Sequence, residues 1–384
     1  MAVIYFDNNA TTRVDPRVVE AMLPFFTEHF GNASSRTHSF GKYASDAVDR
    51  SRDTIATWLG CVKEELTFTA GSTEAINLAL QGIAKRYRSK GNRIITIATE
   101  HQAVLDTCKH LSEVGFEVLT VGVDRNGLVD MKAMEAAVND QTILVCAMLV
   151  NNETGVVQPV SEIADIAHRH KALLFCDATQ APGKHKFNLQ TLNADVLCLS
   201  AHKFYGPKGV GLLYAKRKNP RVSLEPIVFG GGHERGLRSG TLNVPGIVGM
   251  AKALELVSDA SDEIEPLKTL RDKLENTLVQ TGLVEVNGDK TNRAANVSNL
   301  RFAGYDAEDL MLALVNTVAV SSGSACSSET PEPSHVLTAM GLSDYEAKSS
   351  LRFSLGRFNT EQEVDTVLGS IKNHLGLNEP KTSV

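Results

Sequence analysis

Two reactive side chains follow apolar, strand-like runs of the chain. Asp177 ends the run ALLFCD, and Lys203 comes after the run DVLCLS, preceded by Ser200 and His202. In open α/β sheets, ligands bind at the carboxyl edge of the strands, where both side chains would lie. Pyridoxal phosphate requires a carboxylate that keeps its pyridine nitrogen protonated and a lysine that forms a Schiff base. We therefore expect a pyridoxal-phosphate site at this edge.

A turn of small residues could bind the phosphate of that cofactor. Ser72, Thr73 and Glu74 follow Gly71 between the strand-like run ELTFT and a segment of helical period. Helix N-termini bind phosphate well. A hydroxyl residue followed by an acidic one is also an ordinary helix start, so this motif alone leaves both interpretations open.

His101 is a third candidate at the same edge. It follows the strand-like run NRIITIAT and Glu100. Its imidazole could stack on the cofactor ring or move protons near neutral pH.

Six cysteines occur without CxxC pairs, which favours neither a disulfide framework nor a metal site; they are Cys61, Cys108, Cys146, Cys176, Cys198 and Cys326. Cys146, Cys176 and Cys198 lie in apolar runs, so we expect them to be buried. Cys326 differs because it lies among the small and turn-forming residues SSGSACSSETPEPSH, which favour a mobile loop. A cysteine in such a loop is more accessible than the three in apolar runs.

The order of the predicted elements defines the fold class. Between residues 15 and 255 short apolar runs alternate with longer segments of helical period, which predicts an α/β fold with a mainly parallel sheet wrapped by helices. From about 245 to 281 the helical pattern reads as one long segment that could bridge two domains, with a kink near Pro266.

The remaining runs, NVSNLRF, NTVAVSS and SSLRFSL, alternate with helical segments and predict a smaller α+β domain. We expect the large domain at 15–258 and the small domain at 1–14 and 259–384. The Cys326 loop, at about 321–335, would belong to the small domain.

Composition excludes several classes of protein. The chain has 384 residues and a formal net charge of -6, and its Lys and Arg residues form no basic run. The N-terminus has no basic region followed by an apolar segment, and no apolar run approaches about 18 residues. We expect a cytoplasmic chain that binds neither nucleic acid nor membrane directly.

Together these stretches resemble the NifS/IscS-type cysteine desulfurases, which are pyridoxal-phosphate enzymes with the aspartate-aminotransferase-like fold, fold type I. The likeness runs nearly end to end. The matching motifs are DNNATT (7–12), GSTE (71–74), TEH (99–101), VNNETG (150–155), DATQ (177–180), SAHK (200–203), GGHERGLRSGT (231–241), SSGSACSS (321–328) and LRFS (351–354).

The resemblance implies a role for each matching residue. It places Lys203 on the cofactor as the Schiff base, Asp177 on the ring nitrogen, Gln180 on the ring hydroxyl and His101 on the ring face. Four further residues would hold the phosphate, namely Ser72, Thr73, Ser200 and His202. Thr241 would reach the phosphate of a neighbouring subunit, which implies a homodimer with composite active sites. Asn152, also counted as cofactor-binding, and Arg352 would hold the substrate carboxylate.

The implied reaction converts L-cysteine to L-alanine and leaves the sulfur as a persulfide on Cys326. Lys203 would remove the substrate's Cα proton, and His101 would assist deprotonation of the thiol. The persulfide would then pass to a protein acceptor. The tail LNEPKTSV is shorter than the extension that usually docks the general iron–sulfur scaffold, so the identity of the acceptor stays open. Iron–sulfur cluster assembly is the first expectation, and tRNA or DNA sulfuration enzymes come second.

Two alternatives stay open from the sequence. A selenocysteine lyase would use the same site chemistry, but it has less need of Cys326. A non-catalytic scaffold protein could keep the fold without the reaction, although the retained Lys203, Asp177, His101 and Arg352 argue against it.

Overall fold

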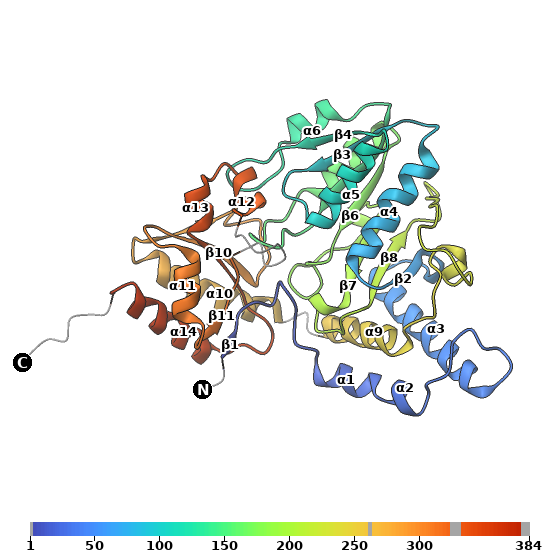
Figure 1. The fold of residues 1–384 in the computed structure, drawn as a ribbon, viewed down its shortest axis with the longest axis horizontal. Coiled ribbons are helices and arrows are strands. Elements are labelled where there is room, and N and C mark those ends of the chain that lie inside the picture. The colour runs from blue at the N-terminus through green and yellow to red at the C-terminus, as the bar shows by residue number, and fades with distance from the viewer. Residues whose placement is uncertain (1–2, 260–262, 323–331, 378–384) are drawn as a thin grey trace, which may run out of the picture.

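The computed structural model describes residues 3–259, 263–322 and 332–377. Its centre is a seven-stranded sheet with the order β2-β8-β7-β6-β5-β3-β4 (Figure 1). The strands are β2 Leu66–Thr69, β3 Arg93–Ile97, β4 Glu117–Val121, β5 Thr142–Met148, β6 Leu173–Asp177, β7 Val196–Ser200 and β8 Gly211–Ala215. Among these strands, β8 alone runs antiparallel to its neighbours. The predicted mainly parallel sheet is therefore confirmed.

Helices cover both faces of this sheet, which explains why its central strands are apolar throughout. The helices α4 (Ser72–Tyr87) and α5 (Gln102–Glu113) share one hydrophobic core with Cys146 and Cys198 of the sheet. On the other face, α3 (Ser39–Leu59), α7 (Val160–Arg169) and α9 (Val244–Asp259) share a core with Cys176. All three cysteines are fully buried, as expected.

A second, smaller lobe has its own sheet and core. Its antiparallel strands follow the order β12-β10-β9, with β9 Val284–Asn287, β10 Val297–Phe302 and β12 Ser350–Ser354. The helices α10 (Ile264–Val279), α11 (Ala307–Leu314) and α14 (Glu361–His374) pack on it. Phe6 belongs to this core, and β1 (Ile4–Tyr5) pairs with β11 (Val318–Ala319). Two separate cores fit a two-domain division, while the boundary near residue 258 and the assignment of residues 1–14 stay predictions, since Val14 packs against the core of the large lobe.

The helical pattern from 245 to 281 forms two helices, α9 and α10, rather than one long segment. Pro266 is the third residue of α10, a place in the first turn where proline removes no intrahelical hydrogen bond. The remaining helices are α1 Pro16–Met22, α2 Pro24–Thr27, α6 Met131–Ala137, α8 Leu189–Leu192, α12 His335–Ala339 and α13 Asp344–Lys348. None of the helices in the described ranges is long and apolar enough to cross a membrane.

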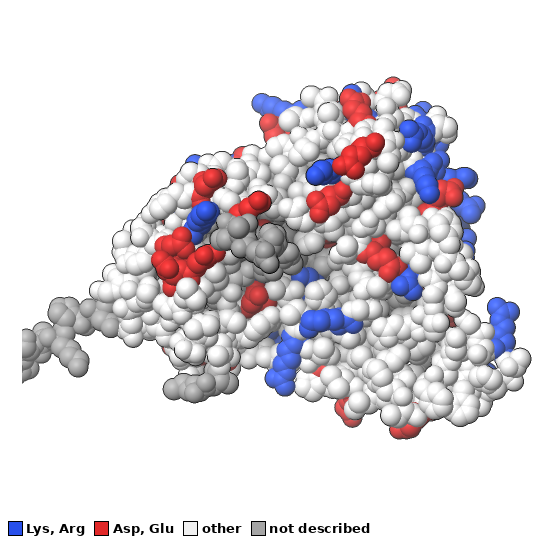
Figure 2. All heavy atoms as spheres, viewed as in Figure 1, with Lys and Arg blue, Asp and Glu red and all other residues white. Residues whose placement is uncertain are grey.

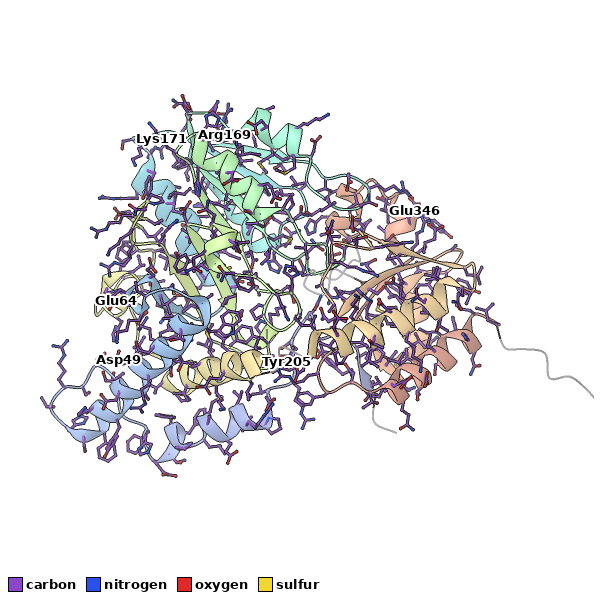
Figure 3. All side chains as sticks on the ribbon, turned by 180° about the vertical axis from the view of Figure 1, so that it is seen from behind. Asp49, Glu64, Arg169, Lys171, Tyr205 and Glu346 are labelled. Carbon is purple, nitrogen blue, oxygen red and sulfur yellow. The ribbon has the colours of Figure 1, made fainter. Side chains whose placement is uncertain are left out.

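The segment 7–12 passes between the two lobes and bonds to both. The amide of Asn8 donates to the carbonyl of Ser354 in β12 (3.0 Å), and the amide of Thr12 donates to the carbonyl of His202 (2.8 Å). Tyr205 lies where the lobes meet (Figure 3): its hydroxyl accepts from the Arg357 amide (2.7 Å), and the Arg357 guanidinium lies 4.2 Å from its ring centre. The junction is therefore held by specific polar contacts.

Candidate active site

The predicted residues meet at the carboxyl edge of the large sheet. Asp177 is the last residue of β6, and Ser200 is the last residue of β7. His101 follows β3 and forms the N-cap of α5. Parallel strands end at a common edge, so three positions distant in sequence lie near one another.

Asp177 is a buried carboxylate whose orientation is fixed by its neighbours. One oxygen, Oδ1, accepts from the Thr179 amide at 2.9 Å and from the Cys198 thiol at 3.4 Å. Burial raises the pKa of Cys198 well above its usual value, so this thiol stays protonated and can donate. The side chain can therefore present a defined carboxylate to a ligand at the sheet edge.

The Lys203 amine is held by main-chain carbonyls of the N-terminal segment. Its Nζ donates to the carbonyls of Asn9 and Ala10, both at 2.7 Å. The neighbouring His202 contacts Thr11 Oγ1 through Nδ1 at 3.1 Å. Burial and then the nearby Lys203 charge lower the pKa of His202 to about 4, so its imidazole is neutral at pH 7.

A cavity of about 650 Å³ brings together the four residues predicted to hold phosphate. Ser72, Thr73, Ser200 and His202 all line it, together with Lys208. The helix α4 begins at Ser72, so its first amides, which have no acceptors within the helix, lie at this cavity. The combination of helix start, hydroxyls and a lysine is suited to a phosphate group.

Two contacts place the start of α4. A Cβ atom on Gly211 of β8 would lie 2.6 Å from Gly71 Cα, so only glycine allows this close approach. Glu74 pairs with Arg238 through both carboxylate oxygens, at 2.7 and 3.1 Å. Arg238 belongs to the motif at 231–241, so this ion pair links that motif to the first turn of α4.

His101 has a defined tautomer when it is neutral. Its Nδ1 accepts from the Ala103 amide at 3.1 Å, so the proton of the neutral ring sits on Nε2. Burial lowers the pKa of His101 more than the nearby Asp177 carboxylate raises it. The neutral ring can therefore donate a hydrogen bond from Nε2. Because Nε2 already carries a proton, it cannot accept the proton of a thiol unless it first loses that proton.

Arg352 and Asn152 come from different lobes and meet at the junction. The Arg352 guanidinium donates to the Asn152 carbonyl at 3.1 Å and to Asp7 Oδ1 at 2.7 Å. Arg352 Nε and Asn152 Oδ1 are buried and, within the described part of the chain, have no hydrogen-bond partner. Such unpartnered buried groups fit a ligand. A substrate carboxylate here would share the guanidinium with Asp7.

The structure does not bring every predicted residue to this edge. Thr241 is exposed and does not line the phosphate cavity of its own chain. Cys326 lies outside the described residues, as does most of its predicted loop. Gln180 lies at the edge, but its amide already contacts Asn9 and Lys184. The described residues contain no cluster of three or more side chains that could hold a metal ion.

Three buried residues near the site were given no role from the sequence: Asn9, Glu100 and Lys184. Glu100 is fully buried, and its Oε1 accepts from the Met148 amide at 2.6 Å. Burial raises the pKa of Glu100 well above its usual value. Asn9 and Glu100 stand in motifs that mark the family, but nothing in those motifs signals their burial or their partners.

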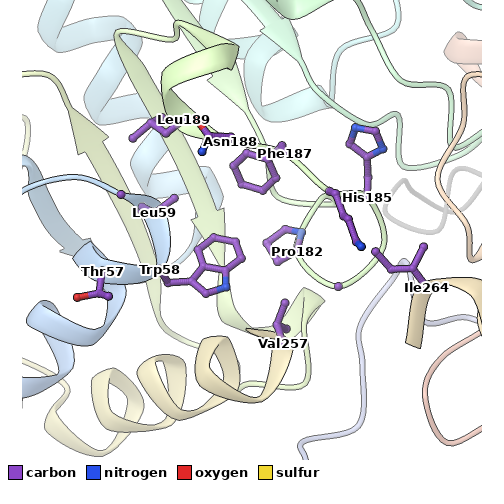
Figure 4. Close-up of a pocket in the computed structure, with 13 residues that line it drawn as sticks. Thr57, Trp58, Leu59, Pro182, His185, Phe187, Asn188, Leu189, Val257 and Ile264 are labelled. Carbon is purple, nitrogen blue, oxygen red and sulfur yellow. The ribbon is translucent and has the colours of Figure 1, made fainter. Parts of the chain in front are cut away.

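A second cavity, of about 520 Å³, contains none of the predicted site residues. Trp58, Phe187, Pro182 and Ile264 line it, and Figure 4 shows the Trp58 and Phe187 rings facing its interior. These two rings pack edge to face at 5.7 Å. Lys184 lies in the segment between Pro182 and Phe187 but does not line this cavity, and its amine contacts Gln180.

The aminotransferase class-V family model matches residues 4–367. The chain therefore belongs to the aminotransferase class-V family, which comprises pyridoxal-phosphate enzymes.

Within that family, the chain is similar to cysteine desulfurases. It is 50% identical over 367 residues to cysteine desulfurase IscS of Anaeromyxobacter sp. strain Fw109-5, covering 95% of this chain and 90% of that protein. It is 48% identical over 376 residues to IscS of Klebsiella pneumoniae strain 342, covering 97% and 93%. A solved NifS-like protein superposes with a TM-score of 0.91 at 39% identity, covering 98% and 100% of the two chains. The resemblance inferred from the motifs and the expected fold class are both confirmed.

Proposed function

We propose that this chain is a pyridoxal-phosphate-dependent cysteine desulfurase that converts L-cysteine to L-alanine and transfers the sulfur to Cys326. One observation carries the proposal. The side chains of Asp177 and Lys203 and the phosphate cavity lie at one sheet edge, in a chain similar to cysteine desulfurases over more than nine-tenths of its length.

The residues present fit pyridoxal phosphate. The cavity at the start of α4 matches the phosphate, the buried Asp177 carboxylate matches the pyridine nitrogen, and Lys203 supplies the amine. Bound there, the cofactor would supply an electron sink for the electron pair of the substrate's Cα–H bond.

The chain's own groups then have separate tasks. Lys203 Nζ would take the Cα proton, and Arg352 with Asn152 would hold the substrate carboxylate. The neutral His101 would donate a hydrogen bond from Nε2 near the reacting sulfur. In the net reaction the C–S bond of cysteine breaks, an S–S bond forms on the enzyme thiol, and the freed carbon gains a proton. Cysteine and an enzyme thiol thus yield alanine and a persulfide, and no outside oxidant is needed.

The exposed surface supports a homodimer in which Thr241 reaches the partner's phosphate site. Phe229, near Thr241 in the chain, is 76% exposed, and Phe26 and Phe30 are 58% and 64% exposed. Figure 2 shows large uncharged areas over α1, α2 and α3. Large exposed aromatic side chains are typical of surfaces that a partner covers.

The proposal extends to a cytoplasmic location and a protein sulfur acceptor. Similarity to proteins named IscS favours an iron–sulfur scaffold, with tRNA or DNA sulfuration enzymes as the other candidates. Pull-down from a lysate with the persulfidated enzyme, followed by transfer of labelled sulfur to each captured protein, identifies the acceptor.

Replacing the proposed nucleophile tests the reaction directly. In Cys326→Ser we expect alanine production to fall by at least about 100-fold, because a serine hydroxyl is a far weaker nucleophile than a thiolate. The variant should still bind pyridoxal phosphate and change its absorbance when cysteine is added. The measurements are alanine release and mass spectrometry of the protein-bound persulfide.

Cys61→Ser is the matched control. Burial and then Glu65 raise the pKa of Cys61 to about 12, so this thiol should not act as a nucleophile, and its loss should leave the rate unchanged. A persulfide on Cys61, together with full activity in Cys326→Ser, would refute the assignment.

A further inference from the structure

Lys184 is a buried lysine with no charged partner. It is 3% exposed, and its Nζ donates to Gln180 Oε1 at 2.5 Å and to Asn9 Oδ1 at 3.1 Å. In the part of the chain that the structure describes, no carboxylate lies within ion-pair distance of it. Burying an amine against two uncharged amide oxygens costs free energy, so this placement calls for a role other than stabilising the fold.

The first consequence of the contact concerns the orientation of Gln180. The two ends of a glutamine amide have nearly the same shape, and its neighbours decide which end faces which way. Lys184 donates, so the amide oxygen must face it. The NH₂ group of Gln180 then points to the Asn9 carbonyl, 2.8 Å away. In the opposite orientation the Gln180 oxygen would face the Asn9 carbonyl oxygen, so two acceptors would oppose each other, and Lys184 would lose one of its two acceptors. Lys184 and the Asn9 carbonyl together thus make Gln180 a donor toward the site.

The second consequence concerns the main chain that holds Lys203. The carbonyl of Asn9 accepts from Lys203 at 2.7 Å, and its side-chain oxygen accepts from Lys184 and from Asn296 (3.0 Å). The Asn9 side-chain NH₂ also donates to the Asn152 carbonyl at 3.1 Å. Removing the Lys184 donor would therefore loosen a residue that contacts three parts of the site.

The surroundings favour an uncharged amine at this position. Burial, and then the positive charges of Lys203 and Arg352, lower the pKa of Lys184 well below its usual value. A neutral amine has two N–H donors, which match the two amide oxygens that accept from it.

We propose that Lys184 is a positioning residue that orients the Gln180 amide and the Asn9 segment against the cofactor and Lys203. This inference deepens the proposed function and rests on it. Lys184 touches the groups that would contact the cofactor, and its influence on the reaction passes through them.

A double-mutant cycle on cofactor affinity tests this role. Apoprotein is titrated with pyridoxal phosphate and followed by absorbance, for Lys184→Met, Gln180→Leu and the double variant. We expect Lys184→Met to weaken binding about tenfold, comparable to the loss of one or two hydrogen bonds. The double variant should lose less affinity than the product of the two single losses, because part of the Lys184 effect passes through Gln180. The matched control is Lys186→Met, an exposed lysine in the same turn, which should bind as the wild type does.

Two results would overturn the inference: wild-type affinity in Lys184→Met, or a double variant whose loss equals the product of the two single losses. Circular dichroism melting of each apoprotein checks folding. If Lys184→Met does not fold, Lys184→Leu, which also lacks a donor, takes its place in the same cycle under the same criteria. Alanine release by the wild type is measured separately, so failure of the desulfurase activity is distinguishable from failure of the Lys184 coupling.

Discussion

Burial determines the protonation of several side chains around the site. Burial lowers the pKa values of His101 and His202, so both rings are neutral at pH 7. Burial also raises the pKa of Glu100, next to His101 in the chain, well above its usual value, which favours its protonated form. The two neutral imidazoles carry no positive charge that would compete with a cationic ligand for the Asp177 carboxylate.

Glu100 makes the stability of the fold depend on pH. The folded state keeps a proton that the unfolded chain releases above a pKa of about 4.3, so stability falls as the pH rises from there toward the raised pKa, by at most about 1.4 kcal/mol per pH unit. Glu100→Gln keeps the acceptor for the Met148 amide and does not titrate. We therefore expect Glu100→Gln to become more stable relative to the wild type as the pH rises from 5 to 8. Urea denaturation of the two apoproteins measures this difference in unfolding free energy.

Glu20→Gln, the same substitution at an exposed position, is the control for this experiment. A Glu100→Gln difference that stays flat across the range would show that Glu100 is ionised in the folded protein.

At the scale of elements, the site depends on how closely β8 approaches α4. The added Cβ of an alanine at residue 211 would lie 2.6 Å from the Gly71 Cα, a distance that real Cβ atoms do not show. Gly211 belongs to β8 and Gly71 is the N-cap of α4, so the backbone of one of them must move.

Gly211→Ala should therefore destabilise the fold by about 1 to 3 kcal/mol, the usual effect of overpacking, and should weaken binding of pyridoxal phosphate because the start of α4 shifts. Urea denaturation and cofactor titration measure the two effects. Gly369→Ala, in the exposed part of α14 where an added Cβ meets nothing within 4 Å, should instead stabilise by about 0.5 to 1 kcal/mol. Unchanged stability and affinity in Gly211→Ala would mean that β8 does not constrain the phosphate cavity.

At the scale of the whole molecule, the site is assembled from both lobes. Arg352 lies on β12 of the small lobe, and its guanidinium reaches the Asn152 carbonyl of the large lobe. The segment 7–12 bonds to both lobes between them. The proposed homodimer would add a third contributor, Thr241 from the partner.

Sedimentation and cofactor titration of Thr241→Val test that contribution. We expect the wild type and the variant to sediment as dimers. We also expect the variant to bind pyridoxal phosphate about 10 to 100 times more weakly, since a hydrogen bond to a charged group is worth about 1.5 to 3 kcal/mol. Thr269→Val, on the exposed surface of α10, is the control and should bind normally. A fully active monomeric wild type would contradict the composite site.

The strand and helix alternation along the sequence is sufficient to predict the central sheet, because apolar periodicity is a local property. It also places Asp177, Ser200 and His101 at one edge, since parallel strands end together. The pairing of Arg352 with Asp7, the contacts of Lys184 with Asn9 and the burial of Glu100 could not be predicted in this way. Arg352 and Asp7 are 345 residues apart, and Lys184 and Asn9 are 175 apart. Such contacts form only when the two lobes close around the segment 7–12, and no short stretch of sequence carries a signal for them.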